Sequence, residues 1–345
     1  MEKEPTIYDI AKLLNLSAAT VSRALNDHPG ISTQTKQLIN SKALELGYRS
    51  NTFASNLRRK ETRTIGVIVP RLDSFFIATV LAGMEKVANE SNYNLIISQS
   101  LEQLKKEMAN AKTMYNTRVD GLLVSLASDT DNLNHFNTFF RKNIPVMLFD
   151  RVMEQKNCTN IVIDNFKAGY EATTHLIGQG CRRIMHVTGN IKRNVYSDRL
   201  KGYRMALLDH GLPADEDLVK VTNLTRQDGL DAVETLTQMT QVPDGLFVAS
   251  DLCAASCVGG LIKKGFSIPQ DVAVVGFNDD PVAQLVAPNL STVRYPGQEM
   301  GEIAAQSLIN HLNGRLRISS TNTILLNHEL IVRESSQRVP KLIKT

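Results

Sequence analysis

The sequence predicts a small all-α unit at the N-terminus and, after it, a larger α/β unit that contains two parallel sheets. Three observations carry this prediction. In the first 49 residues, apolar side chains follow helical spacing between polar capping residues. From Ile65 onward, short runs of Val, Ile and Leu alternate with amphipathic stretches. All of the excess positive charge lies in the first fifth of the chain.

The charge distribution separates the two units and suggests a partner for the first. Residues 1–63 contain ten Lys or Arg and six Asp or Glu, a net charge of +4 that equals that of the whole chain. The remaining residues hold 29 basic and 29 acidic side chains. Because only the N-terminal unit is basic, it is the unit that we expect to meet a polyanion such as nucleic acid.

Length and composition limit the class of protein. The 345 residues suffice for two or three domains, and 42% hydrophobic with 21% charged residues is typical of a globular protein. The chain has no run of about 18 apolar residues, and "MEKEPTIYDI" lacks the apolar core of a signal peptide. We therefore expect a cytoplasmic protein that needs no cofactor or metal ion. Its four cysteines are interpreted as buried thiols, not as zinc ligands or disulfides: Cys158, Cys181, Cys253 and Cys257.

The first predicted helix begins after Thr6 and ends near Leu14. Thr6 and Asp9 form the pattern of an N-cap and its capping partner. Asn15 tolerates the left-handed backbone of a tight turn, so we expect the helix to end there. The apolar residues of this segment have helical spacing: Ile7, Ile10, Ala11 and Leu14.

Two further helices complete the small unit. Ser17 caps a helix that buries Val21 and Leu25, and Ser32 begins a third helix that covers the other two with Leu38, Ile39, Ala43 and Leu46. The small–turn–apolar–apolar spacing of a helix-turn-helix is present at Ala11, Asn15, Leu16 and Val21. A three-helix bundle without a ligand is the alternative. The basic charge favours a DNA reader, because a recognition helix needs basic flanks for phosphates.

A longer stretch makes the prediction specific. "TIYDIAKLLNLSAATVSRALNDHPGISTQTKQLINSKALELGY" resembles the DNA-binding domain of the lactose/galactose repressor (LacI/GalR) family, most strongly at "ATVSRALN" and "ALELGY". "RSNTFASNLRRKETRTIGVIVP" resembles the hinge helix and first regulatory strand of that family. The resemblance implies a helix-turn-helix headpiece at 1–49, a hinge helix and linker at 50–63, and an effector-binding and dimerisation domain at 64–345.

The resemblance assigns base reading to the second helix, which would lie in the major groove. Ala18, Ala19 and Thr20 are then the specificity positions, and Arg23 reaches a base edge, which we expect to be guanine. Ala18 and Ala19 cannot donate hydrogen bonds, so they would read shape or a thymine methyl group. The headpiece contacts that the resemblance implies are Thr6, Ser17, Ala18, Ala19, Thr20, Ser22, Arg23 and Asn26.

The hinge segment would add four DNA contacts, Asn51, Ala54, Leu57 and Arg58. By resemblance, this helix enters the minor groove, where Leu57 wedges into the central base step and kinks the duplex. Ser50 stands where the family often has proline. The hinge helix would therefore begin without the fixed backbone angle that proline supplies.

The large unit is predicted from eight apolar runs: "TIGVIVP", "NLIISQS", "DGLLVSL", "IPVMLFD", "NIVIDN", "RIMHVTG", "DGLFVAS" and "VAVVGFN". Continuous runs between amphipathic helices indicate parallel strands covered on both faces. The pattern restarts near Ile161, which predicts two similar subdomains. This resembles the type I periplasmic sugar-binding fold, with "PNLSTVRYP" and "NHELIVRESS" crossing between the halves. The expected N-subdomain comprises about 64–160 and 292–323, and the C-subdomain about 161–291 and 324–340.

Polar residues follow six of these strands, where open parallel sheets bind ligands. They are Ser125, Asp150, Arg151, Asp164, Arg193, Asp251 and Asn278. Each alone could be a solvated loop residue or a helix cap, but their convergence favours a small polar ligand. The family resemblance adds Asp73, Phe75 and Phe76 as the first cleft loop, with one of the phenylalanines stacking on a sugar. It also assigns Arg193 and Arg199 to the effector.

The class of ligand follows from charge. Asn278 stands where family members often have aspartate, while Arg151, Arg193 and Arg199 bring positive charge to the cleft. This balance favours an acidic or phosphorylated sugar over a neutral one. The alternative is that the arginines form structural ion pairs, Arg199 near Asp198 and Arg151 with another acid.

Three functions fit at least part of these features. A transcription repressor that acts as a dimer fits both units, and its operator would be a palindrome of roughly 16–20 base pairs. The C-terminal "VPKLIKT" has no leucine heptad, which favours a dimer over a tetramer. An enzyme would need a phosphate loop, a nucleotide glycine motif or a nucleophile elbow, and the sequence contains none. A solute-binding protein for a transporter fits only the large unit and would need a signal peptide.

Overall fold

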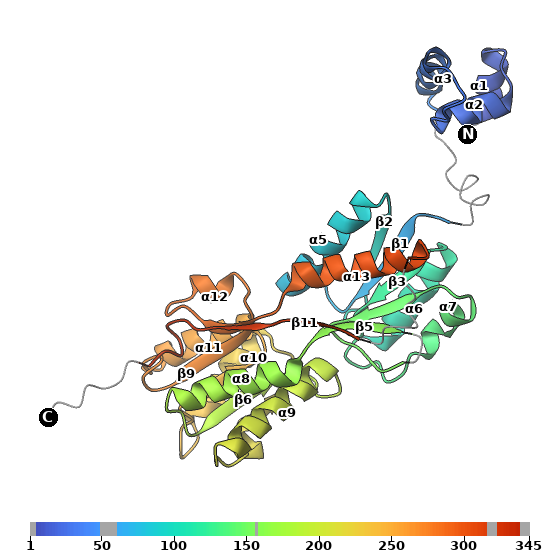
Figure 1. The fold of residues 1–345 in the computed structure, drawn as a ribbon. Helices are drawn as coiled ribbons and strands as arrows, with labels where there is room; N and C mark the ends of the chain where they lie inside the picture. Colours follow the sequence, from blue (N-terminus) through green and yellow to red (C-terminus); the bar gives the residue numbers. More distant parts are fainter. Residues whose placement is uncertain (1–4, 49–60, 156–157, 316–322, 339–345) are drawn as a thin grey trace. The chain divides into compact units, whose positions relative to one another are not determined.

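A computed structural model describes residues 5–48, 61–155, 158–315 and 323–338. The chain divides into two units, a small unit that ends at Thr62 and a large unit that begins at Arg63 (Figure 1). No helix among the described residues is long and apolar enough to cross a membrane. The predicted hinge helix, from Asn51 to Arg58, lies outside the described ranges.

The small unit is a three-helix domain with α1 (Ile7–Leu13), α2 (Ala18–Leu25) and α3 (Thr33–Glu45). All three predicted caps are confirmed. The Thr6 amide donates to Asp9 Oδ2 at 2.8 Å, and the hydroxyls of Ser17 and Ser32 accept the amides of Thr20 and Thr35 at 3.0 and 3.2 Å. These side chains satisfy amide groups that a helix start leaves without partners.

The core of the small unit lies where the three helices meet. Ile10, Val21 and Ile39 are fully buried, one from each helix. Asn15 has a φ of 53°, which confirms the predicted left-handed turn between α1 and α2. The prediction for Leu38 was wrong, since its side chain is 54% exposed. The neighbouring Ile39 occupies the core position, and successive helical residues point about 100° apart.

The large unit contains two six-stranded sheets. The first sheet has the order β11-β5-β4-β3-β1-β2 and is parallel throughout. Its strands are β1 (Thr64–Val69), β2 (Asn94–Gln99), β3 (Gly121–Val124), β4 (Val146–Phe149), β5 (Thr159–Ile163) and β11 (Thr323–Leu326).

The second sheet has the order β12-β10-β9-β8-β6-β7, and only the β10–β12 pair is antiparallel. Its strands are β6 (Ile184–Thr188), β7 (Val219–Val221), β8 (Gly245–Val248), β9 (Ala273–Asn278), β10 (Ser291–Arg294) and β12 (Glu329–Ile331). All eight predicted apolar runs are strands. The four strands that those runs omitted are β7, β10, β11 and β12.

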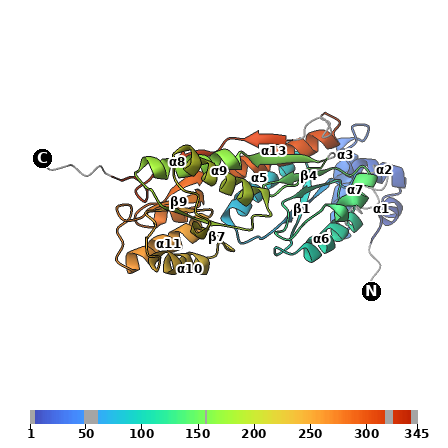
Figure 2. The same cartoon turned by 90° about the horizontal axis from the view of Figure 1, so that it is seen from below.

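Helices cover both faces of each sheet (Figures 1 and 2). The first sheet is covered by α5 (Phe75–Glu90) and α13 (Gly297–Leu312) on one face and by α6 (Leu104–Asn116), η1 (Asn134–Phe136) and α7 (Asn137–Arg141) on the other. The second subdomain contains α8 (Asn165–Gly178), α9 (Asn194–Asp209), η2 (Glu216–Leu218), α10 (Arg226–Thr237), α11 (Asp251–Lys263) and α12 (Val282–Leu285).

Strand β1 shows why the predicted runs were continuous rather than alternating. Ile65, Val67 and Val69 pack in the core that includes α5 and α13, whereas Ile68 packs in the core beneath α6 and α7. Both faces of the strand are therefore apolar, as expected for a parallel sheet covered on both sides.

The chain passes between the two sheets three times, and the strand pairing moves each predicted crossing. Ile161 lies in β5 of the first sheet, so the first crossing follows Ile163 rather than residue 160. Strand β10 pairs with β9, which places the second crossing after Arg294 rather than residue 291. Strand β11 pairs with β5, so the third crossing follows Leu326 rather than residue 323. Hydrogen bonding thus continues three residues beyond each expected boundary.

Candidate functional site

Helix α2 presents one face to the interior and the other to solvent. Val21 and Ala24 are buried, whereas Ala19, Arg23 and Asn26 are exposed. The ion pairs found among the described residues of the small unit involve Lys36 and Lys42, not Arg23. The Arg23 guanidinium therefore extends from a rigid helix with its donors available, which a base-edge contact in the major groove requires.

Several of the other predicted DNA-contacting residues also shape the helix ends. Ser17 Oγ lies 2.8 Å from Thr20 Oγ1, and the Asn26 side-chain amide donates to the Ser22 carbonyl oxygen at 2.7 Å. Thr6 belongs to the cap of α1. Ala18 is half-buried at the start of α2. The hinge residues Asn51, Ala54, Leu57 and Arg58 lie outside the described residues, and their roles stay predictions.

In the large unit, Asp150 is the centre of a buried polar cluster at the end of β4. Its carboxylate accepts hydrogen bonds from Ser125 Oγ at 3.2 Å and from the Tyr295 hydroxyl at 2.9 Å. Burial raises the pKa of Asp150, and Arg151 and the Tyr295 hydrogen bond oppose that rise. Ser125 and Asp150 were predicted for one cleft, and the structure brings them together with a tyrosine that the sequence did not indicate.

Arg151 has an acidic partner from the same subdomain. Its Nη1 lies 2.6 Å from Glu102 Oε2, and its Nη2 donates to the Tyr196 hydroxyl at 3.3 Å. The structural ion pair considered for this arginine is thus present, with Glu102 as the acid. Tyr196 belongs to α9, so the same guanidinium also connects the two subdomains.

Arg199 is buried among aromatic rings and amide oxygens. Its guanidinium carbon lies 3.4 Å from the centroid of Phe277, and its Nε donates to Asn165 Oδ1 at 2.9 Å. The pairing considered with Asp198 is wrong, because Asp198 pairs with Lys201 at 2.8 Å. Burial lowers the pKa of Arg199, since a charged group loses solvation there.

Arg193 lies in a segment that fastens the second subdomain to the first. Its Nη2 donates to the Thr130 carbonyl oxygen. The neighbouring Asn194 accepts the Val152 amide at 2.9 Å and donates to the Asp150 carbonyl oxygen at 3.0 Å. Asn190 donates to the Ser128 carbonyl oxygen at 2.9 Å. These polar contacts hold the start of α9 against the loops that follow β3 and β4.

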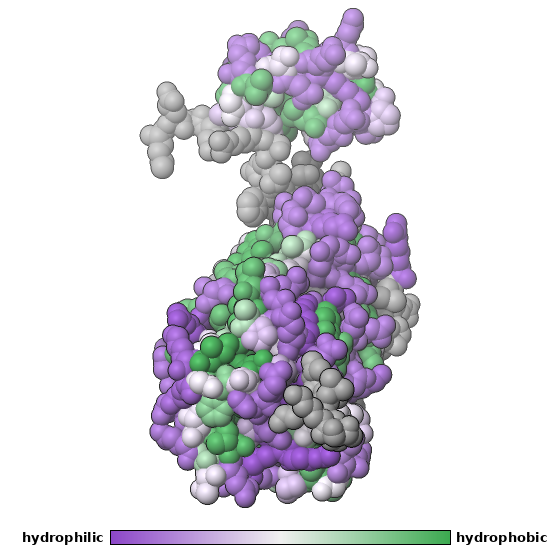
Figure 3. Space-filling view, turned by 90° about the vertical axis from the view of Figure 1, so that its left-hand side faces the viewer, coloured by the Kyte–Doolittle hydropathy of each residue, from purple (hydrophilic) through white to green (hydrophobic). Residues whose placement is uncertain are grey.

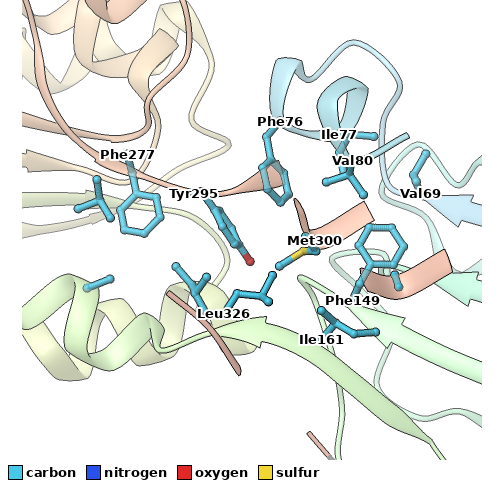
Figure 4. Close-up of a cluster of buried hydrophobic side chains, with 14 of the residues drawn as sticks. Val69, Phe76, Ile77, Val80, Phe149, Ile161, Phe277, Tyr295, Met300 and Leu326 are labelled. Carbon is cyan, nitrogen blue, oxygen red and sulfur yellow. The ribbon is translucent and has the colours of Figure 1, made fainter. Parts of the chain in front are cut away.

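The two phenylalanines of the first cleft loop differ in exposure. Phe76 is buried and stacks on Tyr295, with ring centroids 4.2 Å apart (Figure 4). Figure 4 also shows Phe277 beyond Tyr295, in the same buried cluster. Phe75 is 49% exposed, so it is the ring with an open face for a ligand.

Asp73 and Asp164 were predicted for the cleft, but each has a partner close in sequence instead of joining the cluster around Asp150. Asp73 is exposed and pairs with Arg71 at 2.5 Å. Asp164 caps α8 by accepting the Lys167 amide at 2.8 Å, which is the alternative that the sequence left open for such residues. Both residues follow a predicted strand just as Asp150 does, so the sequence did not indicate that they would lie outside the cluster.

A cavity of about 400 Å³ adjoins the aromatic cluster. Its lining comes from the start of α5, the end of β9 and the start of α13. It includes Phe75, Phe76, Asn278, Asp280 and Tyr295. Asn278 has a φ of 117°, a backbone conformation rare for any residue other than glycine, which suits a position beside a binding site.

Asp251 lies at the start of α11, where it joins three segments. Its carboxylate accepts the Thr292 hydroxyl at 2.7 Å and the Asp280 amide at 2.8 Å. The side chain is fully buried, and burial raises its pKa to about 7. We therefore interpret Asp251 as a residue that fixes the loop after β9, which carries Asn278 and Asp280.

The raised pKa of Asp251 predicts a pH-dependent stability. Since its pKa is higher in the fold than its usual value of 3.8, its contribution to stability is fully present below pH 3.8 and is lost as pH rises to about 7. In Asp251→Asn this loss disappears. We expect the wild type to lose melting temperature relative to the variant between pH 4 and pH 8, measured by calorimetry. A difference that stays constant over that range would contradict the assignment.

Other titrating groups do not obscure this comparison. Burial raises the pKa of Asp280 to about 6, which acts in the same direction, and lowers that of His186 to about 3, which acts in the opposite direction. His186 is present unchanged in both proteins, so its effect cancels in the difference between their melting temperatures.

The interpretation of the cysteines as buried thiols is confirmed: all four are free and buried.

Comparison with known proteins assigns both units. The family model described as "Bacterial regulatory proteins, lacI family" matches residues 6–51, and the model described as "Periplasmic binding protein-like domain" matches residues 173–336. Catabolite control protein A of Priestia megaterium is 30% identical over 333 residues, which cover 96% of this chain and 99% of that protein. The ribose operon repressor of Haemophilus influenzae is 29% identical, with 96% and 98% covered.

Solved structures show the same fold over nearly the whole chain. The transcriptional regulator CelR in complex with cellobiose has a TM-score of 0.73 at 27% identity, with 96% of this chain and 100% of that chain covered. The lac repressor dimer bound to operator and the anti-inducer ONPF has a TM-score of 0.87 at 21% identity, with 97% and 100% covered. With a helix-turn-helix unit, a two-sheet unit and full-length relatives of this kind, the chain belongs to the LacI family of bacterial regulatory proteins and is a DNA-binding transcription regulator.

Proposed function

We propose that this chain is a cytoplasmic repressor of carbohydrate-utilisation genes that acts as a homodimer. Its affinity for a palindromic operator changes when a small sugar-like ligand binds between the two subdomains of the large unit. The observation that carries the proposal is the buried polar cluster around Asp150 in a chain that also has an exposed Arg23 on a helix-turn-helix. The cleft binds its ligand without converting it.

The dimer is supported by an apolar stripe on α11. Leu252 and Ile262 are 52% and 47% exposed, and the small residues Ala255, Ser256 and Gly259 lie between them at helical spacing. Leu285 on the adjacent α12 is 81% exposed. Figure 3 shows apolar residues gathered in a band along one face of the large unit. A second copy of the chain would cover such a surface, and two-fold pairing presents two headpieces to a palindrome.

The cleft can couple to DNA binding through the contacts between its subdomains. Asn190, Arg193 and Asn194 join the start of α9 to the loops after β3 and β4. A ligand that prefers one arrangement of these subdomains shifts the population toward it. The largest possible change in operator affinity then equals the ratio of the ligand affinities of the two subdomain arrangements.

Selection of operator DNA tests the proposal. The purified full-length chain is incubated with a random pool of double-stranded DNA, and bound duplexes are sequenced over several rounds. We expect a palindrome of roughly 16–20 base pairs, bound by two chains. Recovery of DNA without a shared sequence, or of a sequence without two-fold symmetry bound by one chain, would contradict it.

A further inference from the structure

We infer that the ligand of the cleft carries a carboxylate or phosphate group that binds at Arg193, beside Arg151. This inference rests on the proposed function, because it names the class of ligand for the same cleft. Its starting point is a buried guanidinium with most of its hydrogen-bonding capacity unused.

Arg193 is only 4% exposed, and one of its three nitrogens has a partner among the described residues. Nε and Nη1 are buried and have no hydrogen-bond acceptor there. A buried donor without an acceptor costs free energy, and a buried charge without a counter-charge costs more. Folded proteins seldom keep such a group unless something else completes it.

Each of the acids around Arg193 accepts a hydrogen bond from another group. Glu107 accepts the Ala127 amide at 2.6 Å, the Thr130 hydroxyl at 2.9 Å and a hydrogen bond with His135 Nε2 at 2.9 Å. Asp129 accepts the Leu104 amide at 2.5 Å, and Asp131 accepts the Asn132 side chain at 2.6 Å. None of these carboxylates forms an ion pair with Arg193.

The charge balance of the cluster points to the same class of ligand. Three guanidinium groups, those of Arg151, Arg193 and Arg199, lie close enough for the charge of Arg151 to disfavour both of the others. Glu102 neutralises Arg151. Neither Arg193 nor Arg199 forms an ion pair with a described acid. Because burial raises the pKa of Asp150, that carboxyl offsets the excess only in part. Glu107, Asp129 and Asp131 favour the charge of Arg193 without forming an ion pair with it. A bound anion would supply the acceptor that its free nitrogens lack, since arginine binds carboxylates and phosphates by charge-assisted hydrogen bonds.

The position of Arg193 gives an anion a way in. The side chain belongs to the second subdomain and reaches the Thr130 carbonyl oxygen of the first. Separation of the subdomains would expose its two free nitrogens, and closure on an anion would bury the ion pair. Such an ion pair gains strength from the low dielectric of a closed cleft.

Thermal shift with matched ligands tests the inference on the full-length chain. The probes are inorganic phosphate against chloride at equal ionic strength, and glucose against glucuronate and glucose 6-phosphate. We expect the melting temperature to rise with phosphate and with at least one of the two charged sugars. Glucuronate and glucose 6-phosphate distinguish a carboxylate site from a phosphate site. No rise with any anion, or a rise with glucose equal to that with its charged forms, would overturn the inference.

Variants locate the anion. In Arg193→Gln, phosphate affinity should fall by about ten- to hundred-fold, the loss expected for a charge-assisted hydrogen bond. Arg193→Lys keeps the charge and should retain part of the effect, which a purely structural role would not produce. Lys201→Gln is the control, because it removes an exposed cation from α9, the helix that follows Arg193, and should leave the shift unchanged. An equal shift in the wild type and in Arg193→Gln would overturn the assignment.

The two proposals fail separately. If a palindromic operator is selected but only neutral sugars raise the melting temperature, the repressor function stands and the anionic ligand is wrong. If anions bind through Arg193 but no operator is selected, the ligand class stands and the repressor function is wrong.

Discussion

Arg23→Ala is expected to weaken binding to the preferred operator by about ten- to hundred-fold, the equivalent of 1–3 kcal/mol for one base-edge contact. Arg23 extends from the solvent face of α2, while Val21 and Ala24 on the other face hold the helix in its core. The substitution therefore removes a contact with DNA and leaves the fold unchanged. Fluorescence anisotropy with the selected operator measures the loss.

The dependence of affinity on DNA sequence distinguishes a contact between Arg23 and a base from a contact between Arg23 and a phosphate. Arg23→Ala should also relax the preference for one base pair in each half-site, which is read by substituting that base pair. Lys42→Ala is the matched control, since Lys42 is also in the small unit but pairs with Glu45 on α3 at 2.8 Å. Lys42→Ala should lower the affinity for all DNA sequences by the same factor. If Arg23→Ala lowers the affinity for specific and unrelated DNA equally, Arg23 contacts only phosphates.

Gly301→Ala is expected to destabilise the large unit by about 3 kcal/mol, the upper part of the range for overpacking a tight core. Helices α5 and α13 lie side by side with their backbones in close approach (Figures 1 and 2). A Cβ atom at Gly301 would lie 1.9 Å from the Val80 carbonyl oxygen, and one at Gly83 would lie 2.1 Å from the Gln298 carbonyl oxygen. Neither backbone atom can move without separating the helices.

Calorimetry checks this prediction through the melting temperature. For a unit of this size, about 3 kcal/mol lowers the melting temperature by roughly 6–12 °C. Gly178→Ala, at the end of α8, is the control because a Cβ atom there has no neighbour within 4 Å. That variant should be unchanged or slightly more stable, since alanine favours a helix. A melting temperature for Gly301→Ala within about 1 °C of the wild type would show that the helices can separate at little cost.

The local parts of the fold could be predicted from the sequence. Helix caps at Thr6, Ser17 and Ser32 depend on residues three positions apart, and a single chain displays that spacing directly. Seven of the eight predicted strands were visible because both of their faces are apolar and largely buried, whereas β2 is a half-exposed edge strand that the run Leu95–Ile97 revealed. Strands β7, β11 and β12 were missed because they form sheet edges and their residues are half-exposed.

The site could be predicted only as a set of residues. Ser125, Asp150 and Arg151 were predicted from their positions directly after strands, and the structure brings them together. The sequence could not give their partners, because Glu102 and Tyr295 come from distant segments. Tyr295 follows β10 in a crossing segment, a place where a polar aromatic residue between two subdomains could have been considered.

The same limit explains the errors at charged positions. Asp73 and Asp164 have the residue type and the placement of ligand contacts, yet each is satisfied by a residue within three positions. Asp198 is adjacent to Arg199 but pairs with Lys201, one turn along the helix, while Arg199 points into the core. Which neighbour a charged side chain selects depends on helix phase and burial, and sequence proximity does not report either.

Operator affinity, measured with and without a ligand that raises the melting temperature through Arg193, shows whether the cleft controls DNA binding. The selected palindrome is titrated with the full-length chain, and the stoichiometry is determined in the same experiment. We expect two chains for each duplex and an apparent Kd that changes by about tenfold or more when the cleft is saturated. A ligand that binds the cleft and leaves the operator Kd unchanged would contradict it.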